Sequence, residues 1–241
     1  MYINCDVAES YGNFKIGDDP NIIPYVDACN IACGFHGGDP LTIWNTINLA
    51  INHQKLIGAH PSYPDLQGFG RRNMQMNERE LYASMMYQIG AVKSMTEVQG
   101  GKLHHVKPHG ALYNFAAVDT KTANVIAQAI NDIDHSLLVL TQLGSALHTA
   151  ADGLGLQVHG ELFADRRYEV SGQLASRDNE LGVIKSAEDI FRHYQQLVNG
   201  FALTIDGSLI PAQGNTICIH GDHPQALEAL RLIKNHGNRL L

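Results

Sequence analysis

Short apolar runs alternate with segments of helical periodicity along most of the chain. Seven of the apolar runs have the length and composition of buried strands, at residues 2–5, 28–33, 55–59, 103–107, 137–141, 156–159 and 216–219. Between and after them, apolar residues recur at three- and four-residue spacing around residues 81–92, 125–130, 190–198 and 227–233. Strands that alternate with helices predict a parallel sheet covered by helices.

Helix starts are marked by capping residues. A cap followed by an acid in the first turn occurs in two places, Asn77 with Glu80 and Ser186 with Asp189. Pro40 and Pro224 stand where a first helical residue tolerates proline, so we expect helices to begin at these two residues.

Nothing in the sequence divides the chain into separate domains. There is no low-complexity stretch, no heptad run and no linker rich in Pro, Gly or Ser. About seven β/α units in 241 residues favour a single α/β barrel domain over residues 1–241, either closed or incomplete. A doubly wound open sheet fits the same alternation and stands as the alternative.

Composition and charge narrow the function classes. The chain is 44% hydrophobic and 17% charged, like an ordinary globular protein, and its formal net charge is -7. An acidic chain without a run of Lys or Arg is not expected to bind nucleic acid or an anionic membrane. The first residues contain no basic leader and no long apolar stretch, so we expect a cytoplasmic protein. The cysteines form no CxxC pair and are interpreted as buried apolar residues: Cys5, Cys29, Cys33 and Cys218.

Polar and ionisable residues follow nearly every predicted strand. The clusters hold Asp6 and Glu9, His36 and Asp39, His60 and Asp65, Lys107, His109 and Tyr113, Glu161 and Arg166, and His220. The carboxyl ends of parallel barrel strands meet at one end, where such barrels place their active sites. Because ionisable groups are costly to bury unpaired, this convergence indicates a pocket rather than packing.

Some of these residues have a structural alternative. Asp39 fits a helix N-cap as well as a site residue. Arg71 and Arg72 fit a solvated loop pair, although the glycines before them permit a turn towards the pocket. His104 and His105 open a predicted strand and are weaker candidates for the site. Histidines in or beside helical segments are expected at the surface: His53, His135, His148, His193 and His236.

Two kinds of chemistry suit the pocket residues. Carboxylate and imidazole groups from different strands can bind a divalent metal that polarises a carbonyl and activates water. Alternatively, Asp6 or Glu161 acts as a general base while Lys107 stabilises negative charge on an amide oxygen. The sequence does not choose between the two.

Short motifs for nucleotide binding and serine hydrolysis are missing. Gly100-Gly-Lys102 lacks the other residues of a Walker A loop, and Gly153-Leu-Gly155 is not completed to GxGxxG. HExxH and GxSxG do not occur either. The chain is therefore not expected to bind ATP through a phosphate loop of its own.

The segment 161–185 is unusual because it has few periodic apolar residues and carries Arg166, Arg167 and Arg177. A loop of this length within a compact domain is usually functional or disordered. We favour a lid or a partner-docking surface, with disorder as the alternative.

Long uninterrupted motifs at the strand ends resemble the LamB/YcsF family, almost from end to end of the chain. The matching segments are Asn4-Cys-Asp6 with Glu9-Ser10, Asn30-Ile-Ala-Cys-Gly-Phe-His36 with Gly38-Asp39-Pro40, residues 58–72, residues 105–114, Phe163-Ala-Asp-Arg166 and Ile217-Cys-Ile-His-Gly-Asp222. Departures from the family pattern are small: Val7-Ala8 replaces Leu-Gly, Cys29 replaces a smaller residue and Gly37 replaces Ala. None of them replaces an ionisable group.

The resemblance implies a (β/α)7 barrel related to the polysaccharide deacetylases. Members of the family are the A subunits of bacterial 5-oxoprolinase, which opens the lactam ring of 5-oxoproline to give glutamate. The resemblance also implies two partner subunits that handle ATP, and the small-molecule substrate 5-oxoproline.

The convergence of the clustered residues at the strand ends gives them expected roles. Asp6, Lys107, His109 and Glu161 are expected to be catalytic, and a divalent metal, if one binds, is expected on Asp6, His36, His60 and His109. Residues expected to contact the substrate are Glu9, Asp39, Asp65, Arg72, Tyr113, Arg166 and His220. Two other functions stay open: a metal-dependent carbohydrate deacetylase-like hydrolase that needs no partners, and a non-catalytic scaffold that binds the lactam.

Overall fold

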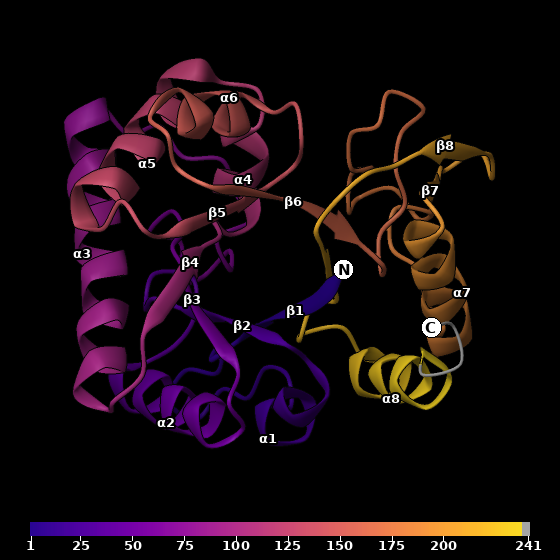
Figure 1. The fold of residues 1–241 in the computed structure, drawn as a ribbon, viewed down its shortest axis with the longest axis horizontal. Helices are drawn as coiled ribbons and strands as arrows, with labels where there is room; N and C mark the ends of the chain where they lie inside the picture. Colours follow the sequence, from indigo (N-terminus) through magenta and orange to yellow (C-terminus); the bar gives the residue numbers. More distant parts are fainter. Residues whose placement is uncertain (238–241) are drawn as a thin grey trace.

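Seven parallel strands close into a barrel at the centre of the protein (Figure 1). Their order around the barrel is β1 (Tyr2–Val7), β2 (Ala28–Ala32), β3 (Leu56–His60), β4 (Leu103–Val106), β5 (Leu138–Thr141), β6 (Val158–Phe163) and β9 (Thr216–Cys218). The last strand, β9, pairs in parallel with both β6 and β1 and so closes the sheet. This computed structural model describes residues 1–237. The predicted α/β barrel is confirmed, and the open-sheet alternative is wrong.

Helices surround the barrel on its outer side (Figure 1). The longer ones are α2 (Pro40–Asn52), α3 (Glu78–Val98), α5 (Thr120–Ile133), α6 (Ala146–Gly153), α7 (Ala187–Val198) and α8 (Ala226–Gly237). Shorter elements occupy the connections: α1 (Asp19–Ile22), the 3-10 turn η1 (Ile23–Tyr25), α4 (Gly110–Ala116) and an antiparallel hairpin of β7 (Phe201–Leu203) and β8 (Leu209–Pro211). Among residues 1–237, no helix combines the length and the apolar character needed to cross a bilayer.

The predicted helix caps are present at three of the four places. Asn77 and Glu80 form a capping box at the start of α3, and Ser186 caps α7 through the Asp189 amide. Asp39 accepts hydrogen bonds from two backbone amides at the start of α2, which begins at Pro40 as predicted. The expected start at Pro224 is wrong, because Pro224 lies in a turn and α8 begins at Ala226.

Strand β6 departs most from the sequence pattern. It was expected at residues 156–159 but runs from Val158 to Phe163, so Glu161 lies within the strand instead of after it. The apolar pattern fails here because Gly160 and Glu161 interrupt it. An ionisable residue inside a barrel strand needs an interior partner, and such a partner does not show in local periodicity.

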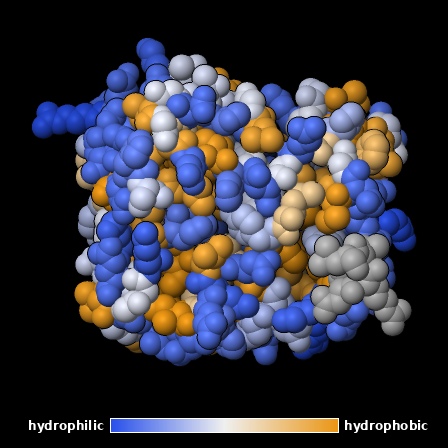
Figure 2. All heavy atoms as spheres, in the orientation of Figure 1, coloured by the Kyte–Doolittle hydropathy of each residue, from blue (hydrophilic) through white to orange (hydrophobic). Residues whose placement is uncertain are grey.

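Alternation along the strands gives the barrel wall two different faces. Residues such as Cys5, Ile31 and Val106 are buried in the apolar layer between strands and helices. Polar residues at alternate positions lie in the interior, where the Asn4 side-chain amide donates to Thr216 Oγ1 at 2.9 Å. All four cysteines are buried and unpaired, as expected. On the face seen in Figure 2, hydrophilic and hydrophobic residues are interspersed.

His193 on α7 is buried, so its expected surface position is wrong. Its Nδ1 lies 3.0 Å from the Ala164 carbonyl oxygen, and its Nε2 accepts a hydrogen bond from the Leu203 amide at 3.0 Å. A carbonyl oxygen can only accept, so Nδ1 carries the proton and Nε2 is bare. Burial lowers the pKa of His193 to about 4.

Replacing His193 by glutamine should make the protein less sensitive to acid. The folded-state pKa lies below the ordinary value of His, so the stability contributed at this site is complete above about pH 6.5 and is lost as the pH falls towards 4. Glutamine can make both hydrogen bonds without titrating. Between about pH 7 and pH 4.5, urea unfolding should show the wild type losing about 2 kcal/mol more than His193→Gln. Equal losses in the two proteins would contradict this account.

Candidate active site

A buried lysine lies between two buried carboxylates where β1, β4 and β6 meet inside the barrel. Lys107 Nζ is 2.8 Å from Asp6 Oδ1 and 2.9 Å from Glu161 Oε1, and no more than 3% of any of the three side chains is exposed. Burial opposes the charge on Lys107, but the facing Asp6 carboxylate raises the lysine pKa well above its ordinary value. Burial also opposes the ionisation of Asp6, and His60 and Lys107 together hold the pKa of Asp6 well below its ordinary value. Lys107 and Asp6 are therefore charged at neutral pH.

Two amide side chains and a histidine in the barrel interior hold Asp6 and Lys107 in place through hydrogen bonds. The Asn30 side-chain amide donates to Asp6 Oδ1 and to Asn4 Oδ1, at 2.7 Å each. His105 Nε2 lies 2.7 Å from Asn30 Oδ1, and because an amide oxygen only accepts, Nε2 carries the proton. Gly58 faces this ring so closely that a side-chain Cβ there would lie 2.1 Å from His105 Nε2.

Two histidines are held by backbone carbonyls so that their other nitrogens face each other. His60 Nδ1 is 2.6 Å from the Lys107 carbonyl oxygen, and His109 Nε2 is 2.8 Å from the Phe69 carbonyl oxygen. Those two nitrogens must carry protons, which leaves lone pairs on His60 Nε2 and His109 Nδ1 in the neutral rings. The two bare nitrogens are only 2.9 Å apart. A favourable contact at this distance needs a positive charge between them, either a proton or a cation.

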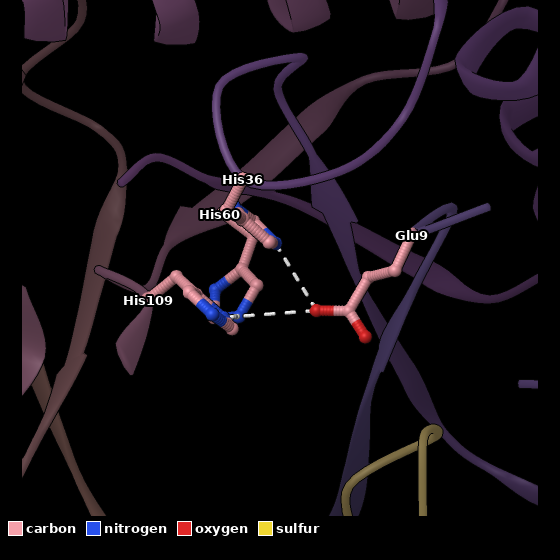
Figure 3. A group of neighbouring side chains, drawn as sticks. All are labelled: Glu9, His36, His60 and His109. Atoms are coloured by element: carbon pink, nitrogen blue, oxygen red, sulfur yellow. Dashed lines mark hydrogen bonds and ion pairs between the residues drawn. The ribbon is translucent and has the colours of Figure 1, made fainter. Parts of the chain in front are cut away.

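Carboxylates surround the same point. Asp6 Oδ2 lies 3.3 Å from His60 Nε2, and Glu9 Oε1 lies 3.6 Å from His109 Nδ1. Figure 3 shows Glu9 pointing at the three gathered imidazoles, where it also pairs with His36 Nε2 at 3.1 Å. The His36 and His109 rings stack with their centroids 3.6 Å apart.

The electrostatics of this cluster suit a cation. Burial lowers the pKa values of His36 and His109 well below the ordinary value, so both rings are neutral and can act as metal ligands. Burial and the nearby Asp6 raise the pKa of Glu9 well above its ordinary value, and a cation bound beside Glu9 would favour its ionised form. One potential ligand atom from each of Glu9, His36, His60 and His109 lies within 4.8 Å of the others. Glu9 thus takes the place in this group that was expected of Asp6.

A second group of potential ligands does not suit a metal. Asp6, Cys218 and His220 also approach within 4.8 Å of one another. However, Lys107 Nζ lies 3.1 Å from Cys218 Sγ and 2.8 Å from Asp6 Oδ1, so an ammonium group already occupies the space. Burial raises the pKa of the Cys218 thiol well above its ordinary value, and a protonated thiol is a poor ligand.

The floor of a cavity of about 660 Å³ is formed by Asp6, His60, Lys107 and His109. Three residues expected to contact the substrate line it: Tyr113, Arg166 and His220. The other four lie elsewhere: Glu9 in the histidine cluster, Asp39 at the start of α2, and Asp65 and Arg72 paired with each other. His220 Nδ1 is held 2.8 Å from Asp165 Oδ2.

The loop after β6 forms one wall of this cavity, along residues 171–178. Its turns close around Arg166, whose guanidinium donates to the backbone carbonyls of Ala175 and Gly182. Arg166 therefore fixes the shape of the loop although it also borders the cavity. The expected roles of this loop as a lid or docking surface stay predictions.

Comparison with known proteins matches the whole barrel to one family. The model of the LamB/YcsF family matches residues 1–239. The chain belongs to the LamB/YcsF family. A protein from Bordetella pertussis (strain Tohama I), named as the A subunit of 5-oxoprolinase, is 45% identical over 233 residues, which cover 96% of this chain and 92% of that protein. A protein of the same name from Bacillus cereus (strain B4264) has the same identity and coverage.

The fold agrees with that of a solved relative. The crystal structure of a lactam utilization protein from Thermus thermophilus is 40% identical and superposes with a TM-score of 0.91, covering 98% of this chain and 97% of that one. The resemblance noted in the sequence is thereby confirmed.

Three buried residues of this LamB/YcsF site were not assigned to it from the sequence: Asn4, Asn30 and His105. A signal for two of them was present, because Asn4 and Asp6, and likewise His105 and Lys107, are two apart along the chain and share a face of the barrel wall. Asn30 needed strand register, which pairs it with Asp6 across β1 and β2.

Proposed function

We propose that this chain is the lactam-hydrolysing component of an ATP-dependent 5-oxoprolinase. The observation that carries the proposal is the pair of bare nitrogens on His60 and His109, set beside the ionised Asp6 on the floor of the cavity. Such an arrangement can take a proton from water and return it. The names of the LamB/YcsF relatives supply the substrate, the lactam 5-oxoproline, whose hydrolysis gives glutamate.

The hydrolysis can be written for the residues of this cavity. His60 donates Nδ1–H to a carbonyl, so only its Nε2 is free to accept a proton, and Asp6 Oδ2 stabilises the imidazolium that forms. As the proton leaves, the water oxygen bonds to the lactam carbon. The ring C–N bond then breaks, and the proton passes to the departing nitrogen, which becomes the amine of glutamate.

Lys107 borders the cavity, but it supports this reaction through Asp6. Its ammonium faces Asp6 and Glu161, with the Asn4 carbonyl oxygen at 3.3 Å and Cys218 Sγ at 3.1 Å, so its three N–H bonds have acceptors within the protein. Its role is to keep Asp6 ionised with Oδ2 directed at His60. This differs from the expected contact between Lys107 and the lactam oxygen.

In place of a shared proton, a divalent cation fits the histidine cluster and would be held by Glu9, His36, His60 and His109. His60 Nε2 would then be a ligand, and the ionised Asp6 beside it would be the group that takes the proton from water. The two facing lone pairs and the four potential ligand atoms within 4.8 Å of one another are the observations that support the fit. Bound there, a cation would supply Lewis-acid polarisation of the carbonyl. Backbone carbonyls already orient His60 and His109, as carbonyls commonly do for metal-binding histidines.

ATP is assigned to partner subunits in this proposal. The sequence carries no phosphate loop of the Walker type, and the names of the relatives, which designate one component of a larger enzyme, support a complex. A lactam carbonyl is a poor electrophile, and phosphorylation of its oxygen by a partner would make the ring carbon more electrophilic. Addition of water and cleavage of the ring C–N bond would then leave an acyl phosphate, which a second water hydrolyses to glutamate and phosphate. The cavity of this chain would then supply the water.

The test is glutamate release from 5-oxoproline and ATP, by this chain alone and with two candidate partner subunits. Release only in the complete mixture supports the proposal. Loss of release after chelation, with recovery on adding Zn²⁺ or Mn²⁺, supports the cation, and full activity after chelation opposes it. No release from the complete mixture would favour a stand-alone metal-dependent hydrolase, for which the Glu9 and histidine cluster is the specific observation.

A further inference from the structure

Among the charged side chains that line the cavity, cations outnumber carboxylates although the protein is acidic. The chain has a formal net charge of -7. Four Lys or Arg side chains line the cavity against two Asp side chains: Arg71, Lys107, Arg166 and Arg177 against Asp6 and Asp178. Carboxylates just outside the lining pair with two of the four cations, so what an anionic ligand can use depends on which cation has no partner.

Three of the four cations already have acceptors in the protein. Lys107 faces Asp6 and Glu161, and the Arg166 guanidinium donates to two loop carbonyls, as described above. Arg71 Nη2 lies 2.5 Å from Asp222 Oδ2, and its guanidinium sits 4.8 Å from the centre of the Phe69 ring. These three side chains shape the cavity, and each is already paired within the protein before any ligand binds.

Arg177 is different. Within residues 1–237 its side chain makes no hydrogen bond or ion pair, although it is partly buried and borders the cavity. Its charge reaches the cavity floor. Burial lowers the pKa of His220, and Arg177 lowers it further although Asp165 opposes the shift. Burial opposes the ionisation of Asp165, but His220 and, to a smaller extent, Arg177 hold the pKa of Asp165 below its ordinary value.

We propose that Arg177 binds the carboxylate of the substrate and selects lactams that carry one. The inference rests on the proposed function, because it takes a lactam as the ligand. A guanidinium forms paired, charge-assisted hydrogen bonds with a carboxylate, and its planar group holds the carboxylate in one orientation. With the carboxylate on the loop wall, the lactam ring is free to lie towards His60 on the floor. A lactam without a carboxylate leaves Arg177 partly desolvated and unpaired.

The test compares 5-oxoproline with pyrrolidin-2-one, the same ring without the carboxylate. Both are titrated calorimetrically into the full-length wild type, Arg177→Ala, Arg177→Lys and the control Arg192→Ala. Arg192 is the matched control, because it lies on α7 with 69% of its side chain exposed and loses the same charge. Thermal unfolding of each variant checks that it folds.

The wild type and Arg192→Ala should bind 5-oxoproline at least about tenfold more tightly than pyrrolidin-2-one. Arg177→Ala should bind the two alike, and Arg177→Lys should keep part of the preference. The inference is overturned if Arg177→Ala keeps the full preference, or if the wild type binds both lactams equally or does not bind 5-oxoproline. Glutamate release by the wild-type complex together with an unchanged preference in Arg177→Ala would overturn only this assignment. Absence of release with a lost preference would overturn only the proposed reaction.

Discussion

Replacing Lys107 by methionine should lower the free energy of unfolding by about 3–5 kcal/mol, because it leaves buried carboxylates without their counter-charge. Asp6 and Glu161 are 3% and 2% exposed, so water cannot replace the lost ammonium. Methionine fills a similar volume, and the loss should therefore come from charge and not from a cavity. Activity should fall as well, since Asp6 would no longer be held ionised and directed at His60.

The pH dependence of this variant should identify the cause. Without Lys107, the two carboxylates are buried near each other, and at least one has a folded-state pKa above its ordinary value. A carboxylate whose pKa is raised in the folded state makes the protein less stable as the pH rises above about 4, the pKa of the same group in the unfolded chain. The deficit relative to wild type should therefore be larger at about pH 8 than at about pH 5.

Lys93 offers the same substitution in an exposed setting. It pairs with Glu97 one turn away on α3, and 24% of its side chain is exposed. Lys93→Met should change the free energy of unfolding by less than about 1 kcal/mol, as for exposed ion pairs in general. Urea unfolding of both variants measures the difference. Equal effects at Lys93 and Lys107, or a deficit at Lys107 that does not depend on pH, would contradict the buried-charge account.

The barrel could be predicted because its outer face follows a regular pattern. Runs such as the one around Ile31 are apolar and short, and the helices between strands have clear periodicity and caps. Three elements gave too little signal: the strands β7 and β8 have three residues each, and α4 has only seven. Elements of this length depend on tertiary contacts more than on local preference.

The interior of the barrel was harder to predict, because the position and role of each interior residue depend on residues from other strands. Asn30 is an ordinary polar residue in the sequence, and only strand register brings it to Asp6. His193 shows the reverse error, since a histidine on a helix was expected at the surface but is covered where Ala164 and Leu203 meet it. Arg177 was one of three arginines in a loop, and it differs from the others because it lies on the cavity wall without a partner among residues 1–237.

Replacing His109 by alanine should reduce the rate of glutamate release in the assembled complex by at least about a hundredfold, the lower range for a positioned acid–base group. His109 Nδ1 is one of the two bare nitrogens, and without it His60 Nε2 loses the group that shares its proton or cation. The folded structure should tolerate the change better than the loss of Lys107. No buried charge is left unpaired, because burial keeps the His109 ring neutral by lowering its pKa.

His135→Ala is the matched control, because that histidine is exposed and hydrogen-bonds only to Asn131 among the described side chains. Free imidazole added to the His109→Ala complex should restore part of the rate, since a small ring can enter the space and supply the missing nitrogen. A purely structural role would not respond to imidazole. If imidazole restores the rate without restoring thermal stability, His109 takes part in the proton transfer itself. Near-normal turnover of the folded variant would instead remove His109 from the reaction and leave the role of base to Asp6 and His60.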